Sequence, residues 1–202
     1  MKTLTLLLVC LVVGLPSFAQ EEKPAIKKGQ IGITYSGFGS NDVYRKEELI
    51  GGQGYLGDRF YNLGISYIYP LNRTFDLETG IEYADHKIII TPSVSPIHYP
   101  SYKEGFSLIT IPVGIRMNFL KYFFVNGGLI FDADASPSMP ITHQTGLGFN
   151  LGLGLKYNFK CGFTAFVNPY SRFHSLVSFS TEKYPQHLLE SGIRLGLMYR
   201  LK

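Results

Sequence analysis

Residues 146–160 read GLGFNLGLGLKYNFK, and every second side chain from Leu147 to Phe159 is large and apolar. The side chains between them belong to glycine, asparagine or lysine. A period of two is typical of a β-strand whose two faces meet different surroundings. Taken alone, the stretch fits a soluble barrel or sandwich as well as a membrane strand. The rest of the chain must therefore decide which face meets water.

Seven further segments repeat this alternation, and no segment after residue 20 holds a long helical period. The predicted strands are 30–39, 59–70, 74–88, 105–119, 122–134, 146–159, 162–177 and 188–201. The connections between them alternate in length: those at 40–58, 89–104, 135–145 and 178–187 are long, and the others span a few residues. Long loops at one end and tight turns at the other are typical of outer-membrane β-barrels.

The polar face of the predicted strands carries too few charges for the exterior of a soluble barrel. It consists mostly of glycine, asparagine, serine and threonine, whereas the other face carries leucine, isoleucine, phenylalanine and tyrosine. The interior of an eight-stranded barrel is only wide enough for side chains to fill. Eight faces of large apolar side chains would overfill it, so the apolar face is predicted to point outward into lipid.

Aromatic residues on the apolar face gather beside the short turns, whichever way a strand runs. This predicted inner girdle comprises Tyr67, Tyr69, Phe75, Phe119, Phe123, Tyr157, Phe159, Phe163 and Tyr199. A second set lies toward the long loops and comprises Tyr35, Tyr61, Tyr83, Phe131, Phe149 and Phe173. For strands tilted by about 40°, the two sets are about 20–25 Å apart along the barrel axis. This separation matches the apolar band between the aromatic girdles of outer-membrane barrels.

We therefore predict an all-β fold, an eight-stranded antiparallel up-and-down transmembrane β-barrel in the outer membrane of a Gram-negative bacterium. It would be monomeric, with membrane lipid as its surroundings. The formal net charge is +4, or +3 without Lys2, and no basic run indicates a nucleic-acid partner.

The first residues, MKTLTLLLVCLVVGLPSFAQ, have the pattern of a cleaved secretory signal peptide over 1–19. A retained anchor helix would need about 20 apolar residues, and a lipoprotein signal at Cys10 would need a small residue where Val9 stands. Residues 20–28 then form a short polar lead-in and 29–202 the barrel domain. The mature chain keeps one cysteine, Cys161, so no disulfide is possible and the thiol has no assigned task.

The inward face is predicted to hold a compensated charge network. Its members are Glu78, Glu82, Arg116, Asp132, Asp134, Lys156, Arg172, Glu190, Arg194 and Arg200. Five acids and five bases favour a structural plug of ion pairs, because a buried charge needs a partner. A narrow channel, or transport or binding of a small ligand through the lumen, is the second hypothesis.

No catalytic, cofactor or metal site is predicted, so the chain is expected not to be an enzyme. His174 and Ser175 invite comparison with lipid-modifying outer-membrane hydrolases, a remote alternative, but adjacent strand residues point to opposite faces. The histidines at 86, 98, 143, 174 and 187 show no metal-ligand spacing. The glycines of 146–154 do not match the dinucleotide-binding pattern. Pro112 and Pro169 lie inside strands, where we expect bulges or local register adjustments.

The two longest polar and aromatic loops, 40–58 and 89–104, are expected to face the cell exterior. Long loops often carry recognition. The leading functional hypothesis is therefore an integral surface protein that binds a partner through these loops, or that serves an envelope or secretion assembly.

With this pattern in hand, the sequence resembles the PorT-like outer-membrane β-barrel domain family over 28–202. The resemblance rests on LETGIEYADHK (77–87), FSLITIPVGIRMNF (106–119), YFFVNGGLIFDAD (122–134), GLGFNLGLGLKYNF (146–159) and SGIRLGLMYRLK (191–202). Ile111–Pro112–Val113 looks like the Ile-Pro-apolar core of the family's fourth strand, and Gly148–Gly154 like the glycine run of its sixth. Some members of the family take part in protein secretion or gliding assemblies and many have no assigned role, so the resemblance implies the fold and the outer-membrane location rather than a particular task.

Overall fold

In the part of the chain that the structure describes, alternating small and large side chains build eight strands and no helix. The computed structural model describes residues 28–45, 52–92, 99–180 and 185–201. The strands are β1 (Gln30–Arg45), β2 (Gly54–Pro70), β3 (Phe75–Thr91), β4 (Tyr102–Phe119), β5 (Phe123–Asp134), β6 (Gly146–Asn158), β7 (Phe163–Ser178) and β8 (Gln186–Arg200). The described residues contain no helix with the length and apolar character of a membrane span. The predicted signal peptide, and the lead-in up to residue 27, lie outside the described residues.

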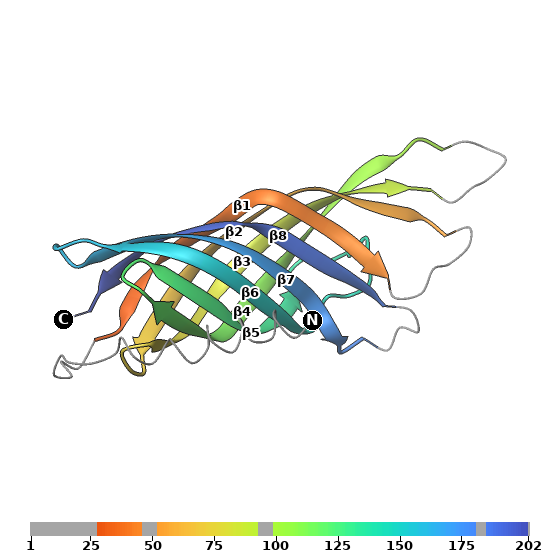
Figure 1. Cartoon of the computed structure of the whole chain (residues 1–202). Helices are drawn as coiled ribbons and strands as arrows, with labels where there is room; N and C mark the ends of the chain where they lie inside the picture. The colour runs from red at the N-terminus through yellow and green to blue at the C-terminus, as the bar shows by residue number, and fades with distance from the viewer. Residues whose placement is uncertain (1–27, 46–51, 93–98, 181–184, 202) are drawn as a thin grey trace, which may run out of the picture.

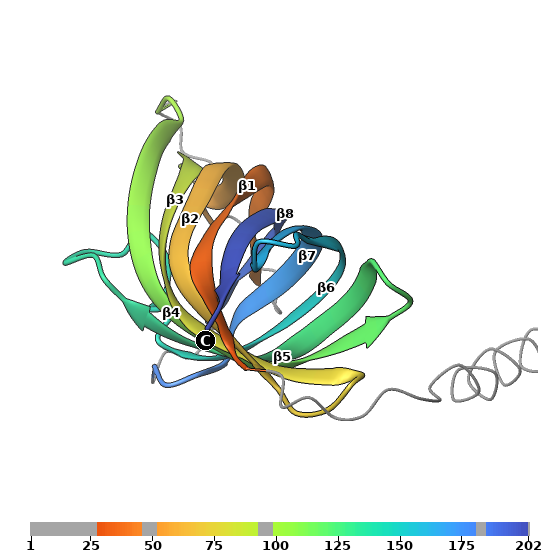
Figure 2. The ribbon, with the colours of Figure 1, turned by 90° about the vertical axis from the view of Figure 1, so that its left-hand side faces the viewer.

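Each strand pairs antiparallel with its neighbour in sequence, and β1 pairs with β8 to close the barrel. The first strand therefore lies between β2, where Ile33 faces Ile65, and β8, where Ile33 faces Leu197. Figure 2 shows this ring from the end that carries the short turns. The predicted fold class, an eight-stranded antiparallel up-and-down barrel, is confirmed.

The strands on the loop side are longer than the sequence predicted. β1 continues to Arg45 and β2 begins at Gly54, while β3 continues to Thr91 and β4 begins at Tyr102. Of the predicted loops, residues 40–45 and 54–58 of 40–58, and residues 89–91 and 102–104 of 89–104, therefore belong to strands. In Figure 1 the β3–β4 hairpin projects beyond the barrel at the end opposite the short turns. We call the extended ends of β1 to β4 the outer hairpins; the extension of β1 pairs with β8, and that of β2 pairs with β3.

Pro112 and Pro169 do not lie at bulges, so that prediction was wrong. Opposite Pro112 the β3–β4 pairing stops after Thr79–Val113 and resumes at Glu82–Thr110 in the same register. A missing N–H interrupts a ladder without inserting a residue. The register shifts lie elsewhere, at Gly37–Ser40 in β1, Gly57–Arg59 in β2 and Leu147–Phe149 in β6.

The barrel interior holds two apolar clusters, one toward each end. Ile68, Phe124, Phe166 and Met198 form the lower cluster at the turn end. The upper cluster lies at the loop end and contains Ala84, Ile88, Ile90, Phe106, Leu108, Ile141 and Leu188. Between the clusters most inward side chains are polar or charged, with Ile130 of β5 as a buried apolar exception. The interior is therefore filled by side chains.

The β5–β6 connection turns inward over the mouth of the barrel. Ile141 of this segment belongs to the upper cluster, and Gln144 is fully buried. The amide of Gln144 donates to the carbonyl oxygen of Gln186 at 2.8 Å and accepts from the backbone N–H of Leu188 at 3.2 Å. The predicted loop 135–145 is thus tied to β8 and closes the upper end of the lumen.

Candidate functional site in the barrel lumen

The lumen site consists of buried ionisable side chains from the inward face of β3, β4, β5, β7 and β8. Among the described residues, the buried members are four carboxylates, three arginines and two histidines. They are Glu78, Glu82, Asp132, Glu190, Arg116, Arg172, Arg194, His86 and His174. The period of two brings them to one face, because residues 78, 82 and 86 of β3 differ by even numbers.

The lower half of the network is centred on Glu78. Arg116 donates to its Oε2 from Nε at 3.0 Å, and Arg194 donates to its Oε1 from Nη2 at 2.6 Å. The guanidinium of Arg116 also lies over the ring of Phe124, 4.1 Å from its centroid, and over that of Phe166 at 4.8 Å. Each arginine thus meets a carboxylate or an aromatic face of the lower cluster, which are the partners a buried guanidinium favours.

The upper half is centred on Glu82 and Glu190. Arg172 donates to Oε2 of Glu82 at 2.5 Å and lies 3.8 Å from Oε1 of Glu190. This Oε1 accepts a hydrogen bond from the Tyr170 hydroxyl at 2.5 Å and one from the Asn62 amide at 2.9 Å. One oxygen of Glu190 is therefore fully engaged, while its Oε2 has no hydrogen-bond partner.

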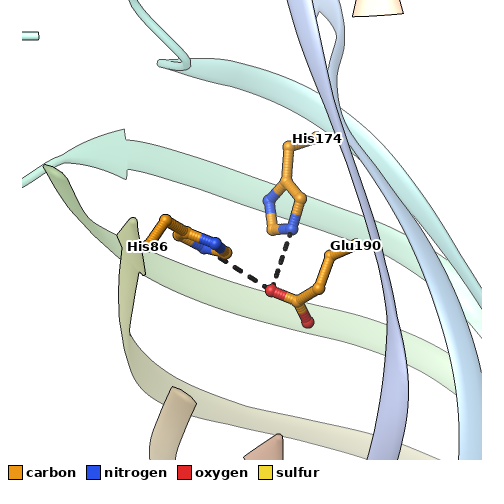
Figure 3. Close-up of side chains that lie close together, drawn as sticks. All are labelled: His86, His174 and Glu190. Carbon is orange, nitrogen blue, oxygen red and sulfur yellow. Dashed lines mark ion pairs between the residues drawn. The ribbon is translucent and has the colours of Figure 1, made fainter. Parts of the chain in front are cut away.

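Two histidines converge on that second oxygen. Nε2 of His86 lies 3.5 Å from Oε2 of Glu190, and Nε2 of His174 lies 3.6 Å from it. In Figure 3 both dashed lines meet at the same carboxylate oxygen. On its other side, Nδ1 of His174 lies 3.1 Å from Oδ2 of Asp132. All four side chains are fully enclosed by protein.

The network is short of one positive charge if both histidines are neutral. Four buried carboxylates face three buried arginines, which leaves a balance of −1. Isolated buried charge is costly, so a proton or another cation is needed near the carboxylates that lack an arginine. Asp132 and the Oε2 of Glu190 are those groups, and both lie beside His174.

The structure brings together seven of the ten predicted network residues. The other three lie at the ends of the barrel. Asp134 is half-buried at the base of the β5–β6 connection, where its carboxylate accepts from the backbone N–H of Gln144. Lys156 is half-buried near the turns and donates to Asn118. Arg200 is exposed near the end of β8. These three residues lie at the rims of the barrel and not in the buried network, which corrects the prediction for them. The alternation predicted that they face inward but not how high along the barrel they lie.

His86 and His174 were missed as partners because their spacing in sequence has no metal-ligand pattern. They come from β3 and β7, on opposite sides of the ring. The alternation of faces along a strand could have found them, because His86 is an even number of residues from Glu82, and His174 an even number from Arg172. Asn62 and Tyr170, the hydrogen-bond donors to Glu190, follow the same parity on β2 and β7.

The expectation that His174 and Ser175 point to opposite faces was wrong. Both residues are fully buried. Ser175 has φ 50°, in the left-handed region, and this turn of the backbone brings two successive side chains inside. The Ser175 hydroxyl has no hydrogen-bond partner, and the imidazole of His174 is directed to Asp132 and Glu190 instead.

The outer wall carries the predicted aromatic residues. Seven members of the inner girdle are exposed and the other two, Tyr67 and Phe119, are half-buried. Neighbouring rings pack together near the turns, with centroids 4.8 Å apart for Tyr157–Phe159 and 5.1 Å for Phe163–Tyr199. The second set, toward the long loops, is exposed on all six strands that carry it. Between the sets the wall exposes leucine, isoleucine and valine.

An apolar cavity of about 880 Å³ opens on the outer wall. Most of its lining consists of outward residues such as Ile33, Leu63 and Leu197, and the inward residues Thr34, Glu82 and Phe166 also line it. A second cavity, of about 10 Å³, lies next to Glu78, about the volume that one water occupies.

A closed antiparallel barrel with a polar, filled interior and an apolar outer band defines a small outer-membrane β-barrel protein. No family model matches the chain, and no curated protein matches it in sequence. Among the solved structures that are similar to the chain, three are at 12–16% identity. The fold and the apolar band together place the chain in the outer membrane of a Gram-negative bacterium.

The outer membrane protein OprG from Pseudomonas aeruginosa has a TM-score of 0.52 at 13% identity, covering 87% of this chain and 97% of OprG. The outer membrane protein AlkL, solved in lipid bilayers, has a TM-score of 0.41 at 12% identity, covering 90% of this chain and 95% of AlkL. Ail, the attachment invasion locus protein of Yersinia pestis, has a TM-score of 0.38 at 16% identity, covering 86% of this chain and 99% of Ail. At this identity the likeness to OprG shows a shared fold.

Proposed function

We propose that this chain is a non-enzymatic outer-membrane barrel with a plugged lumen, and that it binds an extracellular or envelope protein through its outer hairpins. The filled lumen is the observation that carries the proposal. The three buried arginines each lie within 3.0 Å of a carboxylate oxygen. An ion crossing the barrel would have to separate these pairs and displace both apolar clusters.

The outer hairpins supply the binding surface in this proposal. They extend beyond the outer aromatic set and expose Tyr44, Leu56 and Tyr102, while Tyr99 lies exposed beside β4. Aromatic side chains are enriched in protein interfaces. The resemblance to PorT-like proteins, some of which belong to secretion or gliding assemblies, supports a partner in the envelope.

Planar-bilayer recording tests the plug. We expect the refolded full-length barrel to give no discrete conductance steps, because the buried ion pairs and the inward β5–β6 connection fill the lumen. A general porin reconstituted in the same bilayers is the positive control. Reproducible unitary steps from the barrel, at a protein density where the porin conducts, would contradict the proposal and favour a narrow channel.

Cross-linking on intact cells tests the binding surface. In the trimmed variant, the exposed side chains of Tyr44, Leu56, Tyr99 and Tyr102 are trimmed to alanine, which leaves the backbone pairing in place. In the control variant, the exposed side chains of Leu176, Val177 and Phe179, at the same end of the barrel, are trimmed to alanine. We expect a cross-linked protein partner with the wild type and the control, and its loss with the trimmed variant, all three folding normally. Equal cross-linking in all three, or none in any, would argue against the hairpins as the binding surface.

A further inference from the structure

We propose that His86, His174 and Glu190 form a binding site for a divalent transition-metal ion, of which Zn²⁺ is the representative. The site lies between the charged layer and the upper apolar cluster. It is independent of the proposed binding role of the outer hairpins. Figure 3 shows the three side chains directed toward a common centre, from β3, β7 and β8.

The two distances from the carboxylate oxygen to the histidines match the spacing of ligand atoms around a tetrahedral ion. Zinc binds histidine nitrogen and carboxylate oxygen at about 2.0–2.2 Å, which places tetrahedral ligand atoms about 3.4 Å apart. The distances from Oε2 of Glu190 to Nε2 of His86 and of His174 are 3.5 and 3.6 Å. One ligand atom from each of the three residues lies within 4.8 Å of the others.

These ligand atoms are buried and have no hydrogen-bond partner. Both ring nitrogens of each histidine and Oε2 of Glu190 are unsatisfied, in residues that are 0% exposed. Buried polar groups without partners are rare in folded proteins and call for an explanation. A bound cation would supply a partner for one nitrogen of each histidine and for Oε2 of Glu190 at once.

The surroundings fix the ligands in place. Oε1 of Glu190 is held by Tyr170 and Asn62, so its Oε2 is the oxygen left for the ion. The His86 ring stacks between Phe60 and Phe106, with centroids 5.8 and 5.3 Å away. Such packing sets the direction of the imidazole before any ion binds.

Asp132 completes the arrangement from behind His174. Its Oδ1 accepts from the Thr110 hydroxyl at 2.7 Å, and its Oδ2 lies 3.1 Å from Nδ1 of His174. Metal-bound histidines regularly donate their other N–H to a carboxylate, which fixes the tautomer and raises the basicity of the ligand nitrogen. The carboxylate–histidine–carboxylate order Asp132–His174–Glu190 fits that arrangement. The fourth ligand position is left for a water molecule.

A proton on one histidine is the competing occupant, because it brings the net charge of the network from −1 to zero, whereas Zn²⁺ brings it to +1. A measurement of the metal content of the protein distinguishes a bound Zn²⁺ from a protonated histidine. Full-length barrel without a histidine tag is refolded in detergent with ZnCl₂, freed of unbound metal by gel filtration, and analysed by elemental mass spectrometry. We expect about one Zn²⁺ per chain, together with a higher urea midpoint of unfolding when Zn²⁺ is present, since an ion bound to the native state stabilises it.

The substitutions His86→Gln and His174→Gln should abolish this zinc, and Asp132→Asn should weaken it about 10–100-fold. His143→Gln is the matched control, because His143 is exposed at the rim and lies outside the cluster. Wild-type barrel without bound zinc, or equal zinc in His86→Gln and the wild type, would overturn the proposal. Should the variants fail to fold, Co²⁺-loaded wild type decides alone. Absorption of four-coordinate cobalt supports the site, and the spectrum of hydrated cobalt refutes it.

Discussion

At the residue scale, the lumen distributes its charges so that every buried arginine touches a carboxylate. Arg116 and Arg194 share Glu78, and Arg172 binds Glu82. Breaking a buried ion pair by removing one partner leaves an uncompensated charge, which is far more costly than losing an exposed pair. The same protein offers an exposed pair for comparison, Lys103 and Asp58, whose charged atoms are 2.8 Å apart.

Replacing Arg172 by methionine should lower the free energy of unfolding by about 3–5 kcal/mol, because Glu82 is left buried without its closest cation. Urea unfolding in detergent, followed by gel mobility with and without boiling, measures the change. Lys103→Met, the control at the exposed pair, should leave the urea midpoint unchanged within error. The double variant Arg172→Met with Glu82→Gln should recover part of the loss. Equal midpoints for Arg172→Met and Lys103→Met would show that the buried pair is not a stabilising element.

The residues of the network could be predicted from the sequence, but their heights could not. Alternation places Glu78, Arg172 and Arg200 on the inward face alike. It does not say that Arg200 ends at the exposed rim while the other two are buried, because register between strands sets the height. For the same reason the sequence did not predict that His86 and His174 lie close together. Their contact depends on the relative heights of β3 and β7 on opposite sides of the barrel.

At the scale of elements, the short turns impose backbone conformations that their residues do not all favour. In the β6–β7 turn Gly162 has φ 94°, and glycine adopts this region without steric cost. In the β4–β5 turn the residue with positive φ is Leu120, at 55°. Its side chain is 81% exposed, so no core packing repays the strain.

Leu120→Gly should therefore stabilise the barrel. Removing the left-handed strain is worth about 1–2 kcal/mol, and the added freedom of glycine in the unfolded chain costs about 0.5–1 kcal/mol. We expect a small rise in the urea midpoint, with folding otherwise unchanged. Leu71→Gly is the control, since Leu71 is also exposed in a short turn and its φ is not positive. It should lower the midpoint slightly. A lower midpoint for Leu120→Gly as well would contradict this account of the turn.

Strand cores could be read from the sequence, and strand ends on the loop side could not. Period-two alternation predicted all eight strands, but it weakens beyond Gly39 and Lys87, where the outer hairpins begin. There β1 contains a register shift at Gly37–Ser40, with Phe38 at φ 56°. A bulge changes which residues face inward. The alternation of small and large side chains is therefore lost beyond the bulge, although the backbone pairing of the strand continues.

At the scale of the whole molecule, two equally apolar surfaces have different surroundings. The wall between the aromatic girdles faces lipid, whereas the outer hairpins stand beyond it. Leu153 lies on β6 between Phe149 and Tyr157, one from each girdle, and is 54% exposed. Leu56 lies on an outer hairpin and is 61% exposed. Exposure alone does not distinguish these leucines, but depth in the membrane does.

Leu153→Arg should destabilise the folded barrel in lipid vesicles by about 2–4 kcal/mol, the cost of a cationic side chain on the lipid face near the midplane. Leu56→Arg, its control at similar exposure, should change the unfolding free energy little, because the new charge remains in water. Urea titration of vesicle-inserted protein, with gel mobility as the measure of folded fraction, compares the two. If both arginines are tolerated equally, the wall between the girdles is not in contact with lipid. If Leu56→Arg is as damaging as Leu153→Arg, the apolar band reaches beyond the outer girdle and the outer hairpins lie within the membrane.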